Sequence, residues 1–600
     1  MVEKLLKRSE VEERYTWNFK DMYSTKEDFE KDVENLKKMV DDFAEKYDRK
    51  DISIREYKEA IENLDEIYSK TSLINHYGFL QISVDATSND NRILSKKADQ
   101  IENDVYERLS FFESKLYELD EKSWDEISEL LPDYKGYIRQ VRNRAKSALN
   151  PDVEKAIKAL TPVLDGFESI YQTSILCDLE FPDFEVNGKT YPLSFNLYES
   201  KYMYDSDKDV RRKAFEEFSK VLNKYKNTIA EVYYNQVKKE KILATLRGYD
   251  SVIDYLLDIQ ESNKDLFNRQ LDVIMEKFSP VMRKYARALK KARNLDELYF
   301  SDLKIDYDTD YSYSLSIEEA EDMVEKSISI LGDDYKNTVM RYNKERWIDY
   351  PQNIGKDTGG FATMPYGVHP YVMMSWSGNL SSLYTLIHEL GHCGQFIYTS
   401  KHRKFLESGM SMYIVEAPST FNELLLTNYL STKAKEENDP GMERFAISKL
   451  LSDTYFHNMV THLLEAYYQR EVYKIIDRGD SFDADTLCNI KRSVLEKFWG
   501  DDVIINEGAE LTWMRQLHYY MGLYSYTYSA GLTVSTQAFL KIRDGIEGAR
   551  DRWLNFLTYG ERYTPVEASE KAGVDITTDS ALLDTIEYLD KMCDRLIELS

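Results

Sequence analysis

Apolar residues recur every three or four positions along most of the chain, which is the pattern of amphipathic helices packed on a core. Thr25 precedes the first such stretch, and Asp28 follows three residues later, as in a helix-capping box. Helical periodicity covers 26–130 (with breaks near 48–51 and 88–90), 152–177, 206–297, 317–331, 442–478, 484–499 and much of 532–600. The pattern therefore predicts a mainly α protein.

Two stretches depart from the helical pattern. Residues 181–191 place short alternating runs on either side of Asn187-Gly188, which is the strongest local signal for a β-hairpin. Residues 346–376 are rich in glycine, and the segment from His369 to Trp376 reads as a strand. The edge of such a strand can pair with an extended peptide, main chain to main chain. The alternative is a small sheet that only braces the next helix.

Composition narrows the class of protein. Only 24 Gly and 12 Pro among 600 residues agree with a largely helical chain. The net charge of −27, spread along the sequence, argues against nucleic acid as a partner. Four cysteines without paired spacing suit a reducing compartment. The charged N-terminus lacks an apolar signal core, and no run of about 18 apolar residues exists, so we expect a soluble cytoplasmic protein without a membrane span.

The strongest chemical signal is the run His388-Glu389-Leu390-Gly391-His392. Two histidines four residues apart on a helix lie on one face, so both imidazoles can bind one metal ion. Glu389 then lies beside the ion, where its carboxylate can accept a proton from water. The alternative is a chance match in an ordinary buried helix. With only 8 histidines in the chain, we expect such a match in roughly one chain in a hundred.

A third ligand is needed, because catalytic zinc takes three protein ligands and keeps one position open. Glu416 follows His392 by 24 residues, with Ser408-Gly409 between them to turn the chain back. Glu423 falls seven residues later, two helical turns along the same face, as a candidate acceptor for the ring N–H of a ligand histidine. We therefore expect one Zn²⁺ per chain, although a single glutamate is more often a surface residue.

If the metal-bound water attacks a peptide bond, negative charge develops on the carbonyl oxygen. A hydrogen-bond donor besides the metal would lower the barrier to this reaction. The segment 518–531 offers His518 and the alternating tyrosines Tyr524, Tyr526 and Tyr528. The alternative is an aromatic core, which is reasonable in a chain with 46 tyrosines. Upstream, the histidines at positions 457 and 462 are five apart; they do not share a helical face well and are expected to be core or surface residues.

Taken together, these motifs resemble the thimet oligopeptidase/neurolysin family of zinc metallopeptidases, and within it the bacterial oligoendopeptidase F group. The resemblance rests on the His388–His392 motif, on Val-Glu-Ala-Pro-Ser around Glu416, on His518 with the tyrosine run, and on His369-Pro370-Tyr371. It covers nearly the whole chain and implies an elongated multi-helix body divided by a deep substrate channel, with a small β-sheet beside the zinc helix.

The resemblance also assigns roles. It implies that His388, His392 and Glu416 bind zinc, that Glu389 is the base, and that His518 with Tyr526 or Tyr528 steadies the oxyanion. Substrate contacts are expected from His369, Tyr371 and Tyr524. It implies three regions: an N-terminal helical region (1–115), an oligopeptidase N-terminal-type helical subdomain with the hairpin (116–200), and the zinc peptidase catalytic region (201–600). The expected partners are short unstructured peptides, cut at internal bonds with broad sequence preference.

Two other functions stay open. A zinc carboxypeptidase on a similar helical fold would share the zinc motif but would remove C-terminal residues stepwise. A helical scaffold or peptide-binding protein with a structural zinc would need four protein ligands, whereas the sequence offers three and a glutamate placed as a base.

Overall fold

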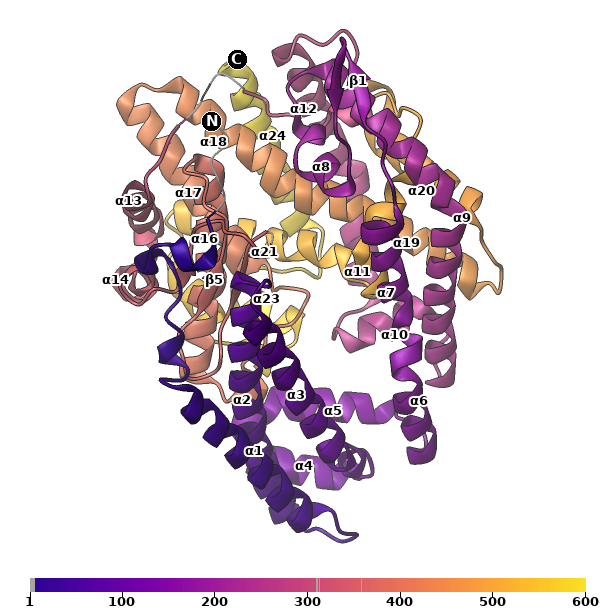
Figure 1. Cartoon of the computed structure of the whole chain (residues 1–600), viewed down its shortest axis with the longest axis vertical. Helices are drawn as coiled ribbons and strands as arrows, with labels where there is room; N and C mark the ends of the chain where they lie inside the picture. The colour runs from indigo at the N-terminus through magenta and orange to yellow at the C-terminus, as the bar shows by residue number, and fades with distance from the viewer. Residues whose placement is uncertain (1–5, 309–310, 312, 358) are drawn as a thin grey trace.

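The computed structural model describes residues 6–308, 311, 313–357 and 359–600, and it is dominated by helices (Figure 1). In the first half these are α1 (Lys26–Tyr47), α2 (Ile54–Val84), α3 (Asn89–Tyr117), α4 (Glu121–Leu130), α5 (Lys135–Lys146), α6 (Pro151–Leu164), α7 (Gly166–Thr173), α8 (Phe195–Ser200), α9 (Lys208–Leu246), α10 (Val252–Ile259), α11 (Lys264–Val273) and α12 (Ser279–Ala292). The second half holds α13 (Ile317–Ile328), α14 (Asp333–Val339), α15 (Arg341–Lys344), α16 (Leu380–His402), α17 (Ala417–Glu437), α18 (Pro440–Lys449), α19 (His462–Asp477), α20 (Ala484–Trp499), α21 (Ser525–Arg543), α22 (Ala549–Phe556), α23 (Pro565–Lys571) and α24 (Ser580–Glu598). The predicted mainly α fold is confirmed.

Local signals set the ends of the first helices. The Thr25 hydroxyl accepts a hydrogen bond from the Asp28 N–H at 3.1 Å, and the Asp28 carboxylate accepts one from the Thr25 N–H at 3.1 Å. This is the reciprocal capping box that the sequence predicts at the start of α1. The breaks predicted near 48–51 and 88–90 fall at the gap between α1 and α2 and at the start of α3.

The β-structure is small and falls in the two stretches where it was predicted. The hairpin pairs β1 (Phe184–Val186) with β2 (Lys189–Tyr191), and both turn residues, Asn187 and Gly188, have positive φ (52° and 76°), as a type I′ turn requires. The second sheet has the order β3-β5-β4, with β3 (Ile348–Asp349) parallel and β4 (Phe361–Thr363) antiparallel to the central β5 (Tyr371–Met373).

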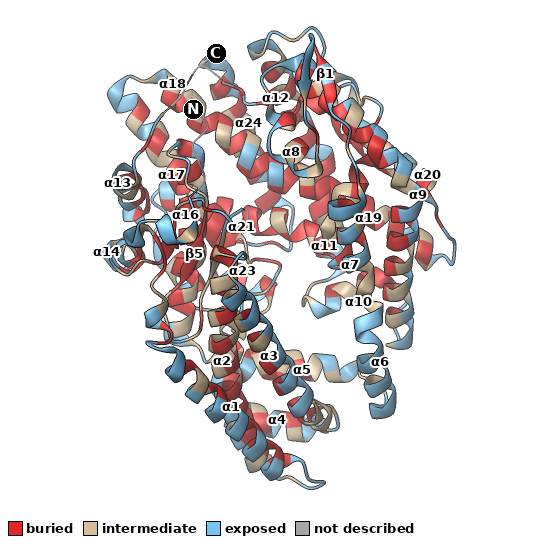
Figure 2. Ribbon diagram, in the orientation of Figure 1, coloured by how far each residue is buried: buried red, intermediate tan, exposed pale blue. Residues whose placement is uncertain are grey.

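The central strand β5 lies between two hydrophobic cores. Side chains alternate along a strand, so Tyr371 and Met373 join the core built on α1–α5, whereas Val372 joins the larger core of the remaining helices. Figure 2 shows buried positions concentrated on α16, α17 and α21, while α1 and α6 keep broad exposed faces. Because β5 directly precedes α16, this sheet fixes the start of that helix within the interior.

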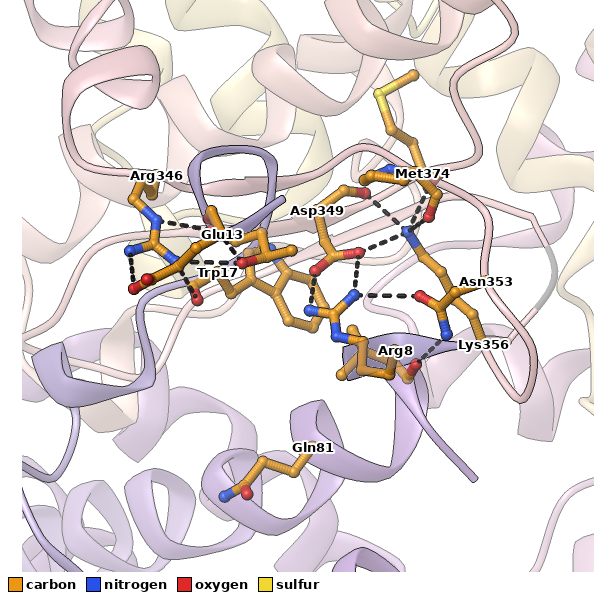
Figure 3. A network of polar contacts seen from close by, with 12 residues as sticks. Arg8, Glu13, Trp17, Gln81, Arg346, Asp349, Asn353, Lys356 and Met374 are labelled. Atoms are coloured by element: carbon orange, nitrogen blue, oxygen red, sulfur yellow. Dashed lines mark hydrogen bonds and ion pairs between the residues drawn. The ribbon is translucent and has the colours of Figure 1, made fainter. Parts of the chain in front are cut away.

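The N-terminal arm is tied to the same sheet (Figure 3). The Trp17 indole N–H donates to the Val372 carbonyl at 2.9 Å. Asp349 is fully buried between Arg8, whose guanidinium approaches its Oδ1 at 2.9 Å, and Lys356, whose ammonium lies 2.7 Å from the same oxygen. Since a buried carboxylate is stable only when it is paired, these contacts hold the arm and the loop between β3 and β4 against the sheet.

Two further expectations concern membrane spans and the division of the chain into regions. Among the helices of the described residues, none has both the length and the apolarity that crossing a membrane requires. The predicted boundary at 115 falls inside α3, and the core of α1–α5 continues to Val141. The division into three regions and the deep substrate channel stay predictions.

Candidate metal centre and active site

Helix α16 carries the paired histidines. It begins after Asn379, whose side chain accepts a hydrogen bond from the Ser382 N–H at 2.9 Å. The apolar residues of the motif are completely buried, so they fix the rotation of the helix about its axis. His388 and His392 then lie one turn apart, with their ring centroids 5.2 Å from each other.

Glu416 stands at the N-terminal end of α17 and turns its carboxylate towards both rings. Its Oε2 lies 3.3 Å from Nε2 of His392 and 3.6 Å from Nε2 of His388, and the hydroxyl of Ser419 donates to the same oxygen at 2.8 Å. Two ligand atoms about 2.1 Å from a tetrahedral zinc ion are about 3.4 Å apart. These separations are too long for direct hydrogen bonds of normal length, and they fit a bound metal ion.

Close packing of α16 on α17 sets this arrangement. A Cβ atom added at Gly391 would lie 2.4 Å from the carbonyl oxygen of Pro418 and 2.7 Å from the Cα of Ser419. Glycine at position 391 therefore lets the backbone of α16, next to His392, contact the backbone of α17 two residues after Glu416. A second glycine, Gly531 on α21, similarly lies against the backbone at Glu416.

Glu423, farther along α17, contacts the first histidine from behind. Its Oε1 lies 2.6 Å from Nδ1 of His388, and the hydroxyl of Thr454 donates to its other oxygen. With Nδ1–H bonded to a carboxylate, the Nε2 lone pair of His388 is left facing Glu416 and is free to bind a metal. The structure thus brings together all four residues that the sequence nominates for metal binding and its support.

The charges of this group favour a cation. Burial acts to lower the pKa of His388, yet the hydrogen bond to Glu423 and the nearby carboxylates raise it to about 10. Burial acts to raise the pKa of Glu416, but the positive charge of His392 holds it well below its usual range. In the metal-free protein these carboxylates thus favour a protonated His388, and a metal ion must displace protons when it binds.

Glu389 lies within electrostatic reach of the metal group and is nearly buried, with 6% of its surface exposed. Burial raises the pKa of Glu389, and the two neighbouring histidines oppose that rise. A Cβ atom at Gly360 would lie 3.5 Å from its Oε1, so the loop leading into β4 lies against this carboxylate. A carboxylate with a raised pKa beside a metal site suits a group that accepts and then returns a proton.

The oxyanion candidates are divided by the structure. His518 has its ring centroid 5.1 Å from that of Tyr524 and 5.7 Å from that of Tyr528, so these three form one cluster. The carboxylate of Glu416 raises the pKa of both tyrosines, after the larger effect of burial, which places the cluster within electrostatic reach of the metal group. Tyr526 differs: it is completely buried and its hydroxyl donates to Gln260 at 2.7 Å. On a helix, residues two apart face different sides, which is why Tyr526 points away from the cluster.

Sequence reasoning missed a histidine pair beside this cluster. The residues predicted as one helix from 442 to 478 form α18 and α19 with π-helical turns at Leu450–Tyr455 and His457–Thr461 between them. A π turn bonds residue i to i+5, so it brings His457 and His462 onto one face with their Nε2 atoms 3.0 Å apart. The ring of His462 also stacks on that of Tyr528 at 4.1 Å. The expectation that these two histidines do not share a face is wrong, and the sequence carries no signal for the π turn.

The substrate contacts predicted for His369 and Tyr371 are not supported. The imidazole Nε2 of His369 lies 3.0 Å from the Asp21 carboxylate of the N-terminal arm, and the ring stacks on Trp347. Tyr371 is fully buried, and its hydroxyl donates to the Asn18 carbonyl at 3.4 Å. Both side chains brace the N-terminal arm, which the sequence analysis did not predict.

The strand edge available to a peptide is also different from the one predicted. Because β5 pairs on both sides, its own edges are used, and the outer edge next to α16 belongs to β4. Within the described residues, β4 pairs only with β5, so its other edge keeps unpaired main-chain groups. These groups lie directly after Gly360, where an added Cβ atom would lie 3.5 Å from Oε1 of Glu389.

Comparison with known proteins identifies the family of the chain. The model of peptidase family M3 matches residues 201–588, and that of oligopeptidase F matches residues 115–181. The chain is similar to oligopeptidase PepF of Bacillus subtilis (24% identity, 99% of this chain and 88% of that protein) and to an oligoendopeptidase F homolog of Borreliella burgdorferi (24% identity, 97% and 98%). Its fold resembles the crystal structure of oligoendopeptidase-F from Enterococcus faecium, with a TM-score of 0.73 and 21% identity over 96% of this chain and 99% of that one. The chain therefore belongs to peptidase family M3 and is a metallo-oligopeptidase.

Proposed function

We propose that this peptidase hydrolyses internal bonds of short unstructured peptides with one Zn²⁺ held by His388, His392 and Glu416. The observation that supports this most directly is the convergence of two Nε2 atoms and one carboxylate oxygen, 3.3 and 3.6 Å apart, on a single point. The side chain of His388 is 27% exposed, so solvent reaches the group. Zinc with three protein ligands keeps a position open, which is the arrangement of catalytic and not of structural sites.

Zinc in this position would activate a water molecule and polarise the carbonyl of the scissile bond. Glu389 takes the proton of the attacking water and returns it to the leaving amine. Its raised pKa suits both transfers, because a group with a pKa nearer neutrality gives up a proton almost as readily as it takes one. Glu423 keeps the His388 ring oriented through the contact at Nδ1.

The developing oxyanion is stabilised by His518 together with Tyr528 or Tyr524. Burial and the surrounding carboxylates raise the pKa of both tyrosine hydroxyls, so each stays protonated and can donate a hydrogen bond to a negatively charged oxygen. The stacking of His462 on Tyr528 fixes the plane of that ring.

Substrate binding follows from the free edge of β4. An extended peptide that pairs with this edge would be held by main-chain hydrogen bonds, and its scissile carbonyl would pass Gly360 and Glu389. Because main-chain pairing does not depend on the side chains of the peptide, it supports a broad sequence preference for the substrate. Folded proteins do not offer a free extended backbone, so the substrates are short peptides.

Cleavage of an internally quenched fluorescent peptide tests the proposal. We expect the Glu389→Gln variant to lose roughly 10²–10⁴-fold in kcat while it keeps its zinc, because the ligands are untouched and only the proton transfer is removed. Glu240→Gln is the matched control: Glu240 is likewise buried with a raised pKa, but it bonds to Tyr473 and Gln236. Equal activity of the two variants would contradict the role of Glu389. Mass spectrometry of the products separates the reactions, since stepwise loss of C-terminal residues would identify a carboxypeptidase.

A further inference from the structure

A cavity of about 90 Å³ lies beside the oxyanion cluster, between α8, α20 and the π-helical turns that precede α19. Its wall is mainly apolar and includes Phe456, Leu464 and Trp499. Four charged side chains interrupt this wall: Lys304, Glu465, Lys491 and Arg515. Charges in the wall of a partly enclosed, mainly apolar space are stable only when each is compensated.

Neither lysine forms an ion pair within the described residues, although Asp453 attracts Lys304 and Glu465 attracts both lysines over longer distances. Lys491 is 4% exposed, and within the described residues its ammonium has neither a hydrogen bond nor an ion pair, only the Tyr468 ring at 5.7 Å. Lys304 donates to the hydroxyl of Thr461 at 3.2 Å and lies 4.3 Å from the centre of the Phe456 ring, again with no described carboxylate at ion-pair distance. Burial lowers the pKa of each lysine to about 8, so both are still cations at neutral pH.

The other two charged side chains of the wall, Arg515 and Glu465, already have bonded partners. Arg515 forms a bidentate ion pair with Glu199 at 2.5 and 2.6 Å. Glu465 accepts hydrogen bonds from Nδ1 of His462 at 2.7 Å and from the Ser525 hydroxyl at 3.1 Å. Burial lowers the pKa of His462, so this ring is a neutral donor. Counted with the partners bonded to it, the wall carries three positive and two negative charges, an excess of one positive charge that Asp453, outside the wall, opposes in part.

The sign of this charge decides between two kinds of ligand. His462, Glu465 and His518 place ligand atoms within 4.8 Å of one another, as a metal site would. However, Nδ1 of His462 is already bonded to Glu465, and the charges of Lys304 and Lys491 act on this group and would repel a cation. The same two charges attract an anion.

We propose that this cavity binds one small monovalent anion, a halide or a small carboxylate, between the ammonium groups of Lys304 and Lys491. One such ion balances the wall. The cavity is also connected to the site, because Arg515 and Gln516 in its wall lie three and two residues before His518. Glu465 lines the cavity as well, and its carboxylate lies 3.6 Å from Nδ1 of His518. Anion binding therefore fixes the segment that carries His518, so turnover depends on the anion. This last step rests on the proposed function, whereas the binding itself does not.

Bromide tests the binding without any measurement of activity. In crystals of the full chain grown in bromide, we expect an anomalous peak in the cavity that Lys491→Met removes and Lys497→Met keeps. Lys497 is the matched control because it lies on the same helix α20 but is exposed and donates to the Tyr467 hydroxyl. Lys304→Met gives an independent second variant, should Lys491→Met fold poorly. A cavity without bromide, or a peak that survives both lysine substitutions, would overturn the proposal.

The link to turnover is tested with the quenched peptide at constant ionic strength. Replacing chloride by gluconate, which is too large for the cavity, is expected to lower kcat/KM several-fold, and bromide or formate should restore it saturably in the wild type but not in Lys491→Met. Equal rates in all anions would overturn the link even where bromide binds. A carboxylate could also come from the substrate, so the assay is repeated with a C-terminally amidated peptide. An anion effect that appears only with the amidated peptide would show that the substrate carboxylate fills the cavity, and it would overturn the assignment to a free anion.

Discussion

The substitution Gly391→Ala tests whether the contact between α16 and α17 sets the metal geometry. The new Cβ would lie 2.4 Å from the Pro418 carbonyl oxygen, and contacts below 3.0 Å are essentially never seen, so the two backbones must separate by about 0.6 Å. One of them carries His388 and His392 and the other carries Glu416, whereas zinc–ligand distances hold to within about 0.2 Å. We expect zinc affinity to fall by roughly 10–100-fold, the size of effect seen when support for a ligand is lost. The assay is competition with a chromophoric zinc chelator at fixed pH.

Gly394→Ala is the matched control on the same helix. Its Cβ would meet the Tyr335 hydroxyl at 2.5 Å, a similar overlap, but that neighbour holds no ligand. Both variants should lose stability, by about 1–3 kcal/mol for overpacking, partly offset by the higher helix propensity of alanine. Only Gly391→Ala should lose zinc. Equal zinc affinity in the two variants would refute the argument that this helix contact positions Glu416.

Three further substitutions test other parts of the site and the core. Glu423→Gln leaves Nδ1 of His388 without its carboxylate and should weaken zinc binding by roughly 10–100-fold in the same competition assay; unchanged affinity would contradict the orienting role. Tyr528→Phe should lower kcat by roughly 10²–10³-fold with little change in KM, whereas Tyr526→Phe should leave kcat unchanged. A larger loss of kcat in Tyr526→Phe than in Tyr528→Phe would contradict the assignment of Tyr528 to the oxyanion. Burial raises the pKa of Glu240 from 4.5 to about 7, so between these pH values the folded protein keeps a proton that the unfolded chain loses. As the pH rises from 4.5 to 7, the free energy of unfolding of the wild type should therefore fall relative to that of Glu240→Gln, by up to about 3 kcal/mol. The same difference in free energy of unfolding between the two proteins at pH 5 and at pH 8, measured with urea, would contradict this.

Features set by local sequence could be predicted. The box around Thr25 and Asp28 and the Asn187-Gly188 turn each depend on a few neighbouring residues, and the structure shows both. The spacing of His388 and His392 likewise fixes two rings on one helical face without knowledge of the fold. The position of Glu416 cannot be derived from local sequence in this way, because it depends on a loop of 14 residues that turns α17 back onto α16. Only the residue types around Glu416 indicated that it belongs to the site.

Features set by long-range packing could not be predicted. The pairing of His457 with His462 depends on a π turn, which has no composition signal, and a regular α-helix would have kept the rings apart. The strand at Tyr371 was predicted, but its place in the centre of the sheet depends on two partners that lie before it in the sequence. The same holds for Tyr526, whose hydroxyl faces Gln260 on a distant helix end.

The central claim is that one metal ion is bound by His388, His392 and Glu416. X-ray diffraction from crystals of the zinc-loaded protein, recorded on both sides of the zinc absorption edge, measures this directly. We expect one anomalous peak per chain, about 2.0–2.2 Å from Nε2 of both histidines and from Oε2 of Glu416, without a fourth protein ligand. A peak at His462, Glu465 and His518 instead, or a fourth side chain on the ion, would contradict the proposed mechanism.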